Sequence, residues 1–135
     1  SKGVIGIINR VNNRFSRVIS ILNSESRINA QLSKTNHFGS LIWNGKNPNI
    51  VQLIDVPRQA PVKEGDTIVT GGKSLIFPEG IPIGSIEDFK LDQSESYYTI
   101  NVKLFNDMTN IGYVYVIENL EREEILELEE QEDEQ

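Results

Sequence analysis

Short runs of apolar and β-branched residues, separated by turn residues, extend over most of the chain. From residue 97 to 105, Tyr98, Ile100, Val102 and Leu104 alternate with polar side chains, as in a strand with one buried face. About nine such runs recur every 8–12 residues or so, which predicts an all-β barrel or sandwich. The expected strands cover residues 4–8, 18–22, 28–32, 40–43, 50–54, 67–70, 83–86, 97–105 and 112–117.

Turn residues separate these runs and exclude long helices from the middle of the chain. Four prolines lie between Val56 and Ile83, interleaved with glycines. Asn44-Gly45 favours a type I′ hairpin turn, because both residue types tolerate a positive φ.

A second turn signal follows the V-x-x-G-D-x-I pattern that begins at Val62. Gly65 permits a tight turn there, and Asp66 is expected to cap the turn by accepting hydrogen bonds from nearby amides. This string alone is unspecific, because it also opens strands in PDZ domains and biotinyl-type barrels.

Charge is distributed very unevenly along the 135 residues. The formal net charge is −7, but residues 121–135 hold nine acidic groups and one basic group and so contribute −8. The other 120 residues hold 11 acidic and 12 basic groups, a net +1. We therefore expect a nearly neutral folded part and an acidic tail over 121–135, either frayed helix or disordered.

Cysteine is absent, which excludes disulfides and thiolate metal sites. No apolar run approaches the ~20 residues that span a bilayer, and no signal peptide is found. We expect any membrane anchor to lie outside this sequence.

Candidate catalytic and ligand sites are poorly supported. His37 is the single histidine, and no serine lies in a G-x-S-x-G or G-D-S-G context, so His37 is expected to be a surface or turn residue. Carboxylates lack metal-loop spacing. Gly71-Gly72-Lys73-Ser74 lacks the leading glycine of a phosphate-binding loop and is interpreted as a tight turn. We predict no catalytic residue, no cofactor and no metal.

A basic bias marks the first third of the chain, where Glu25 is the opposing charge. The whole domain is not basic enough for nucleic acid, so these residues are expected as a charged strand edge or a site for an acidic protein partner. The bias comes mainly from Arg10, Arg14, Arg17, Arg27 and Lys34.

Several strings together resemble the β-domain of the bacterial MreC family of cell-shape proteins. The most specific is Val62–Gly72 followed by Ile76–Ile86, which is similar to the family's "V-x-x-G-D-x-V-V-T-S-G…F-P-x-G-l-x-V-G". Gly72 stands where a serine is usual, and either residue fits a turn. Further matching strings are Gly3–Ile8, Val18–Asn23, His37–Leu41, Trp43-Asn44-Gly45, Tyr98–Lys103 and Val114–Ile117.

The resemblance implies two small six-stranded-type β-barrels side by side, the second inserted in the first. We place the first over 1–30 with 92–120 and the second over 31–91, followed by the acidic flexible tail 121–135. It also implies a membrane anchor through a transmembrane helix before residue 1, on the periplasmic side of the inner membrane.

The function implied by the resemblance is that of a non-catalytic scaffold of the cell-elongation (rod) complex. Such a scaffold links MreB and MreD to the class B penicillin-binding protein that crosslinks peptidoglycan, and it self-associates. Nucleic acid is not an expected partner. Rival hypotheses are a PDZ-like peptide-binding module, a degenerate trypsin-like hydrolase and an envelope adaptor of the membrane-fusion kind.

Aromatic and arginine residues are the usual anchors of protein interfaces. On that basis we select candidate partner-binding residues, with core packing as the alternative for each and as the preferred role for Phe77. They are Arg10, Arg14, Arg17, Phe38, Trp43, Arg58, Phe77, Tyr97 and Tyr98.

Overall fold

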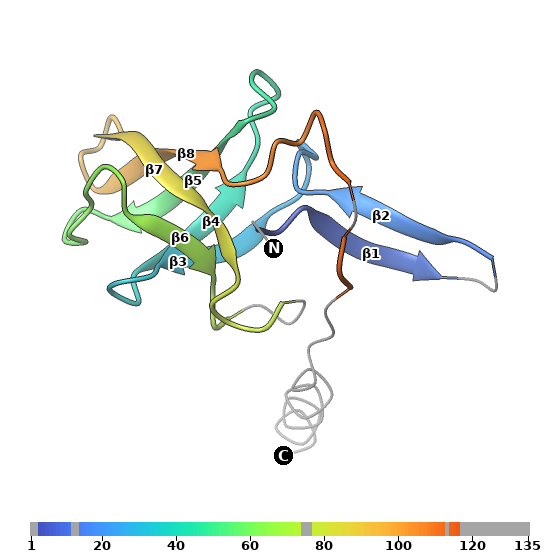
Figure 1. Ribbon diagram of the computed structural model, residues 1–135. Helices are drawn as coiled ribbons and strands as arrows, with labels where there is room; N and C mark the ends of the chain where they lie inside the picture. The colour runs from blue at the N-terminus through green and yellow to red at the C-terminus, as the bar shows by residue number, and fades with distance from the viewer. Residues whose placement is uncertain (1–2, 12–13, 74–76, 113, 117–135) are drawn as a thin grey trace, which may run out of the picture.

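The computed structural model describes residues 3–11, 14–73, 77–112 and 114–116, with the backbone alone at 9, 10, 16 and 17. Eight strands form two antiparallel sheets in these ranges (Figure 1). The strands are β1 (Gly6–Val11), β2 (Ser16–Ser20), β3 (Ile28–Leu32), β4 (Phe38–Ile42), β5 (Ile50–Pro57), β6 (Thr67–Thr70), β7 (Pro82–Leu91) and β8 (Tyr97–Leu104).

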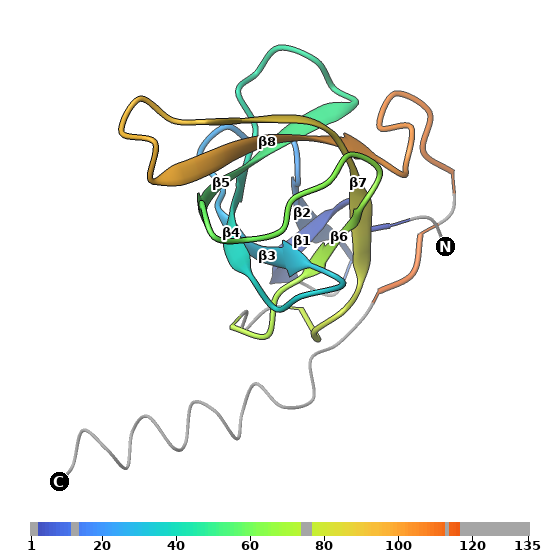
Figure 2. The ribbon, with the colours of Figure 1, turned by 90° about the vertical axis from the view of Figure 1, so that its left-hand side faces the viewer.

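Six of the strands close into a barrel in the order β3-β4-β5-β8-β7-β6. Figure 2 looks into this ring of strands from one end. β3 pairs with both β4 and β6, and this pairing closes the ring. Every barrel strand therefore has two neighbours and no edge is left unpaired.

The core lies inside this ring and is built from alternate residues of each strand. Leu53, Ile83, Ile100 and Val102 have no exposed surface, and burial of each such side chain contributes about 1.5–3 kcal/mol. The buried Thr70 hydroxyl donates to the Pro78 carbonyl at 2.7 Å and accepts from the Ile81 amide at 2.8 Å. The core is thus apolar with its buried hydroxyl satisfied.

β1 and β2 form a separate two-stranded hairpin that extends away from the barrel (Figure 1). A bulge interrupts the ladder between Ile8 and Arg10. The base of the hairpin is held by the Val4 amide, which donates to the Pro82 carbonyl at 3.0 Å. Val4 and Ile21, on either side of the hairpin, are buried in the barrel's core cluster.

Two sequence predictions are corrected by the fold. The ninth strand is wrong, because residues 112 and 114–116 are not in a strand; 113 and 117 lie outside the described residues. The type I′ turn is also wrong, because only Gly45 has a positive φ, of 81°, and Asn44 does not. The Asn44 amide instead donates to Gln52 Oε1 and its side chain accepts from the Lys46 amide, which stabilises a longer loop.

The V-x-x-G-D turn is confirmed in part. Gly65 adopts a φ of 88°, as a tight turn requires. The Asp66 carboxylate, however, pairs with the Lys34 ammonium at 3.1 Å and not with a neighbouring amide. The cap prediction for Asp66 is therefore wrong, because its carboxylate is paired with a cation from the β3–β4 loop.

The all-β class is confirmed, and one closed barrel is present. Residues 97–104, which were grouped with 1–30, lie in that barrel between β5 and β7. The assignment of β8 is corrected accordingly, since ladder pairing and not position in the chain determines membership. That the hairpin belongs to a second barrel stays a prediction, and the acidic tail lies outside the described residues.

Candidate protein-binding surface

The β1–β2 hairpin is the open part of the described fold. β1 pairs with β2 and with no other strand among the described residues, so each has one edge without a ladder partner. Such an edge presents unpaired amides and carbonyls to any extended chain that approaches it. A two-stranded hairpin alone is only marginally stable in water. The hairpin is therefore a candidate region for contact with another protein chain.

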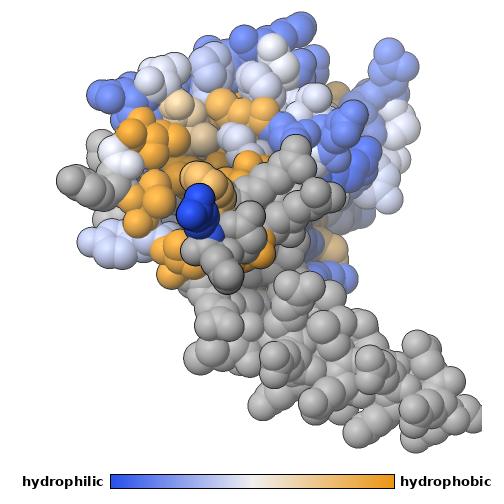
Figure 3. All heavy atoms as spheres, turned by 90° about the vertical axis from the view of Figure 1, so that its right-hand side faces the viewer, coloured by the Kyte–Doolittle hydropathy of each residue, from blue (hydrophilic) through white to orange (hydrophobic). Residues whose placement is uncertain are grey.

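The two faces of the hairpin differ in burial. Ile7 packs against the core cluster. On the other face Ile8 and Val18 are register partners, 37% and 55% exposed. This alternation follows from the two-residue period of a strand. Figure 3 shows hydrophobic residues gathered on the side of the molecule from which the hairpin projects.

Further large apolar side chains are exposed nearer the hairpin tip and after the barrel. Val11 is 72% exposed and Phe15 is 73% exposed. Tyr115, in the segment that follows the barrel, is 83% exposed. Clusters of exposed apolar side chains on a soluble domain mark sites of interaction.

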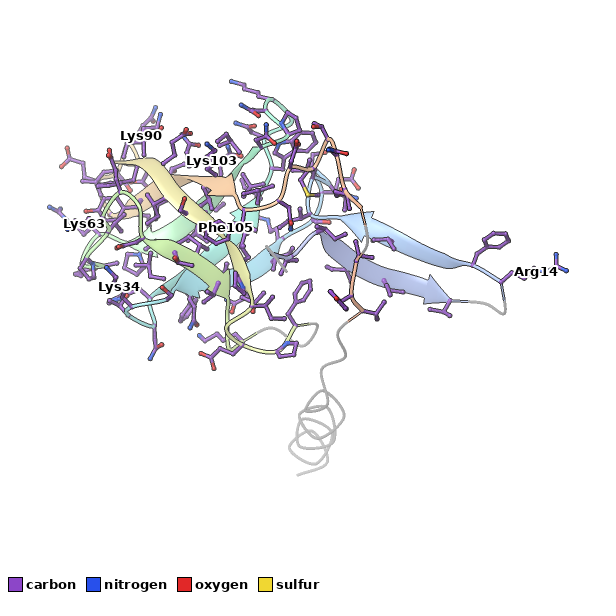
Figure 4. All side chains as sticks on the ribbon, viewed as in Figure 1. Arg14, Lys34, Lys63, Lys90, Lys103 and Phe105 are labelled. Carbon is purple, nitrogen blue, oxygen red and sulfur yellow. The ribbon has the colours of Figure 1, made fainter. Side chains whose placement is uncertain are left out.

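Three of the selected arginines belong to this hairpin. Arg14 is exposed and lies at the tip (Figure 4). Arg10 and Arg17 are backbone register partners in β1 and β2, and their side chains lie outside the described part of the structure. Residues 6–20 contain these three arginines and no aspartate or glutamate. The hairpin thus combines three cations with exposed apolar groups and has no acidic residue within its own span.

Phe38 lies at a second place, on the barrel wall. It begins β4 and is 40% exposed. The Lys73 ammonium lies 3.8 Å from the centroid of its ring, a cation–π contact.

Arg58 and Tyr97 lie together at a third place, at the far ends of β5 and β8. Tyr97 pairs with Pro57 in the ladder, and the Arg58 amide donates to the Ser96 carbonyl at 3.1 Å. Both side chains are exposed. The selected residues on the surface thus lie in three separate regions: the hairpin, the barrel wall at Phe38, and the ends of β5 and β8.

Trp43, Phe77 and Tyr98 are partly buried and pack against the core cluster. The Trp43 indole donates to the Asn47 carbonyl at 2.9 Å. Tyr98 contacts Phe89 edge to face, with ring centroids 5.6 Å apart. These contacts support core packing as their role.

Sequence reasoning missed the exposed aliphatic part of the hairpin surface. Val18 was interpreted only as a strand former, because apolar residues in a strand are normally buried, and Val11 was placed between two expected strands. The sequence did hold a signal for this exposure. The two expected strands at 4–8 and 18–22 are short and adjacent in the chain, and a two-stranded pair cannot bury both of its faces.

Sites for catalysis or metal binding are not found among the described residues. His37 Nδ1 lies 2.9 Å from the Thr35 hydroxyl, and His37 has no carboxylate partner among the described residues. No group of three metal-ligating side chains occurs within the described ranges. In the β7–β8 turn the Ser94 hydroxyl, with the amides of Ser96 and Tyr97, holds the pKa of Asp92 below its usual value.

Within the same ranges, no helix has the length and apolar character needed to cross a bilayer.

Comparison with known proteins gives one consistent family. The model of "rod shape-determining protein MreC, barrel core" matches residues 1–118. The curated cell shape-determining protein MreC of Escherichia coli is 26% identical over 121 residues, which is 90% of this chain and 33% of that protein. The chain thus spans about a third of the length of that relative.

Solved structures agree in fold. MreC of Listeria monocytogenes superposes with a TM-score of 0.74 and 27% identity, over 81% of this chain and 53% of that one. A complex between penicillin-binding protein PBP2 and MreC from Helicobacter pylori gives a TM-score of 0.61 at 17% identity, over 76% of this chain and 62% of that one. Another similar structure is the major periplasmic domain of an MreC.

The family match covers the hairpin, the barrel and the segment after it, and the barrel topology accompanies it in structures from separate bacteria. The chain therefore belongs to the rod shape-determining MreC family of cell shape-determining proteins.

Proposed function

We propose that this chain is a non-catalytic scaffold domain of the bacterial rod complex and that it binds a class B penicillin-binding protein. The observation that carries the proposal is the family match over residues 1–118, together with the solved complex of a relative with PBP2. The proposal places the domain on the extracytoplasmic side of the membrane, in keeping with the periplasmic domain of the similar MreC.

The hairpin surface supplies the physical basis for binding. A stable interface buries roughly 800 Å² on each partner, and its energy concentrates in a few arginine and aromatic anchors. Arg14 and Phe15 offer this combination at the hairpin tip, both exposed. Val18, 55% exposed, adds apolar area further along the hairpin, opposite Ile8.

The proposal also includes self-association and links to MreB and MreD, with the membrane anchor in a segment before residue 1. The unpaired edges of β1 and β2 support contact with other chains, because an edge strand accepts a further strand without disturbing the barrel.

The test is binding of the chain to the extracytoplasmic part of its own class B penicillin-binding protein, by interferometry at physiological salt. We expect saturable micromolar or tighter binding, since standard interfaces of this size reach that range. Arg14→Glu should weaken it at least tenfold or so, because it places a negative charge at the proposed contact. Arg58→Glu tests the alternative region beside Tyr97 in the same way.

Lys63→Glu is the matched control, since it makes the same charge change on the barrel, away from the hairpin tip (Figure 4). Equal melting temperatures of the variants would show that binding and not folding is measured. If all three variants bind alike, the hairpin and Arg58 are not contacts. No binding by the unmodified chain at high concentration would contradict the proposed partner.

A further inference from the structure

Cations and anions are separated between three parts of this chain. The barrel span, residues 28–104, holds seven basic and eight acidic residues, a net −1. The hairpin, residues 6–20, holds three arginines and no acid, a net +3. Residues 121–135 contribute −8. The most basic and the most acidic stretches of the chain are therefore close to its opposite ends.

We propose that the acidic segment 121–135 docks on the β1–β2 hairpin of its own chain. The primary argument is charge complementarity. Unlike charges attract strongly within the Debye length, about 8 Å at physiological ionic strength. The hairpin sequence, residues 6–20, offers a negative segment three arginines and contains no aspartate or glutamate.

Lysines of the barrel are poorer targets for this segment. Lys34 is paired with Asp66 at 3.1 Å. Lys63 is followed directly by Glu64, and Lys90 follows Asp88 by two positions in β7, where both side chains are exposed. Figure 4 shows these lysines on the barrel, whereas Arg14 projects at the hairpin tip.

Apolar groups on the two segments are complementary as well. The acidic segment contains Ile125, Leu126 and Leu128 among its glutamates. The hairpin offers Phe15 and Val11, which are 73% and 72% exposed. Burial of such side chains contributes about 25 cal/mol for each Å² removed from water. The contact therefore does not depend on charge alone.

The chain length allows the contact within one molecule. The Asn106 side-chain amide donates to the Gly3 carbonyl at 2.6 Å, so the chain leaves the barrel beside the entry to β1. Asn106 and Glu121 are fifteen positions apart, a stretch that spans up to about 50 Å when extended. β1 has six residues, about 20 Å of strand. Tethering gives an effective concentration in the millimolar range.

Docking of this segment would cover the same hairpin surface that a partner protein would use. The tail then acts as an internal competitor, and its release raises the accessibility of Arg14 and Phe15. The contact itself is a property of the isolated chain, so its test does not depend on the identity of any partner.

The experiment uses the full chain, in which the absence of cysteine allows clean labelling of one introduced thiol. A nitroxide on Gln131→Cys should broaden the amide NMR signals of β1 and β2 and leave those of β4 and β5 sharp. Raised salt should abolish the broadening, because screening shortens the range of the attraction. The triple variant Arg10→Gln, Arg14→Gln, Arg17→Gln should abolish it as well.

The matched control is Lys63→Gln, Lys90→Gln, Lys103→Gln, which removes the same charge from the barrel and should leave the broadening in place. Uniform broadening, no broadening, or equal effects of the two triple variants would overturn the proposal. Mixing isotope-labelled chain with spin-labelled, unlabelled chain, at a concentration where sedimentation shows only monomers, should give no broadening. Broadening in that mixture would assign the contact to a second copy and contradict docking within one chain.

Discussion

The barrel and the hairpin are built from similar sequence, yet they differ in how much of that sequence is buried. Val51 in β5 has no exposed surface, whereas Val18 in β2 is 55% exposed. Each barrel strand has a partner on both edges, whereas among the described residues β1 and β2 pair only with each other. The two regions therefore differ in whether their strands close into a ring, and not in the types of residue that they contain.

This difference separates two tasks within one small domain. A closed ring satisfies its backbone internally and so resists both unfolding and aggregation. An open hairpin leaves hydrogen-bonding edges and apolar side chains available, as contact with other chains requires. The same type of substitution made in the barrel and in the hairpin shows how differently the two regions contribute to stability.

Replacement of a tightly packed glycine should show the largest contrast. A Cβ on Gly84 in β7 would lie 2.2 Å from the Lys103 carbonyl oxygen, and one on Gly6 in β1 would lie 2.5 Å from that of Ile19. Gly84→Ala should reduce the free energy of unfolding by about 3 kcal/mol, because closed strands cannot separate. Gly6→Ala should reduce the free energy of unfolding by only about 1 kcal/mol. β1 can move away from β2 to make room for the methyl group, because among the described residues no further strand holds it on its other edge.

Denaturant unfolding of both variants gives the comparison, with Gly112→Ala as a control in open space. Equal losses for Gly84→Ala and Gly6→Ala would mean that the hairpin is as constrained as the barrel.

Removal of two methyl groups from a valine gives the next largest contrast. Val51→Ala should lower the free energy of unfolding by about 2 kcal/mol, from lost burial and the cavity that remains. Val18→Ala should change it by less than about 0.5 kcal/mol, as is usual for an exposed site. Thermal melting monitored by circular dichroism measures both, and a large loss for Val18→Ala would show that the exposed hairpin face is covered.

The smallest expected effect concerns the β7–β8 turn, where the pKa of Asp92 is held below its ordinary value by hydrogen bonds from Ser94, Ser96 and Tyr97. A carboxyl whose pKa is lower in the folded state adds stability above its unfolded pKa and loses it as pH falls through the folded pKa. The melting difference between Asp92→Ala and the unmodified chain should be present at neutral pH and shrink below about pH 4. A pH-independent difference would mean that the ionised carboxylate is not the stabilising form.

A large part of this architecture follows from the sequence. Alternation in 97–105 predicted β8 correctly, and the apolar runs predicted the other barrel strands to within a few residues at most ends. Local patterns succeed here because the two-residue period of a half-buried strand is imposed by backbone geometry. The candidate site was only partly predictable. The arginines of the hairpin were evident, but the exposure of Val11 and Val18 beside them was not.

The sequence by itself determined the β class, the turn at Gly65, the unequal distribution of charge and the family resemblance, because each depends on neighbouring residues or on a string of them. The tertiary structure alone decided that β8 lies between β5 and β7, that Lys34 reaches Asp66, and that the hairpin remains outside the ring. These outcomes depend on pairing between residues distant in the chain, and the period of one strand does not specify which strand lies beside it.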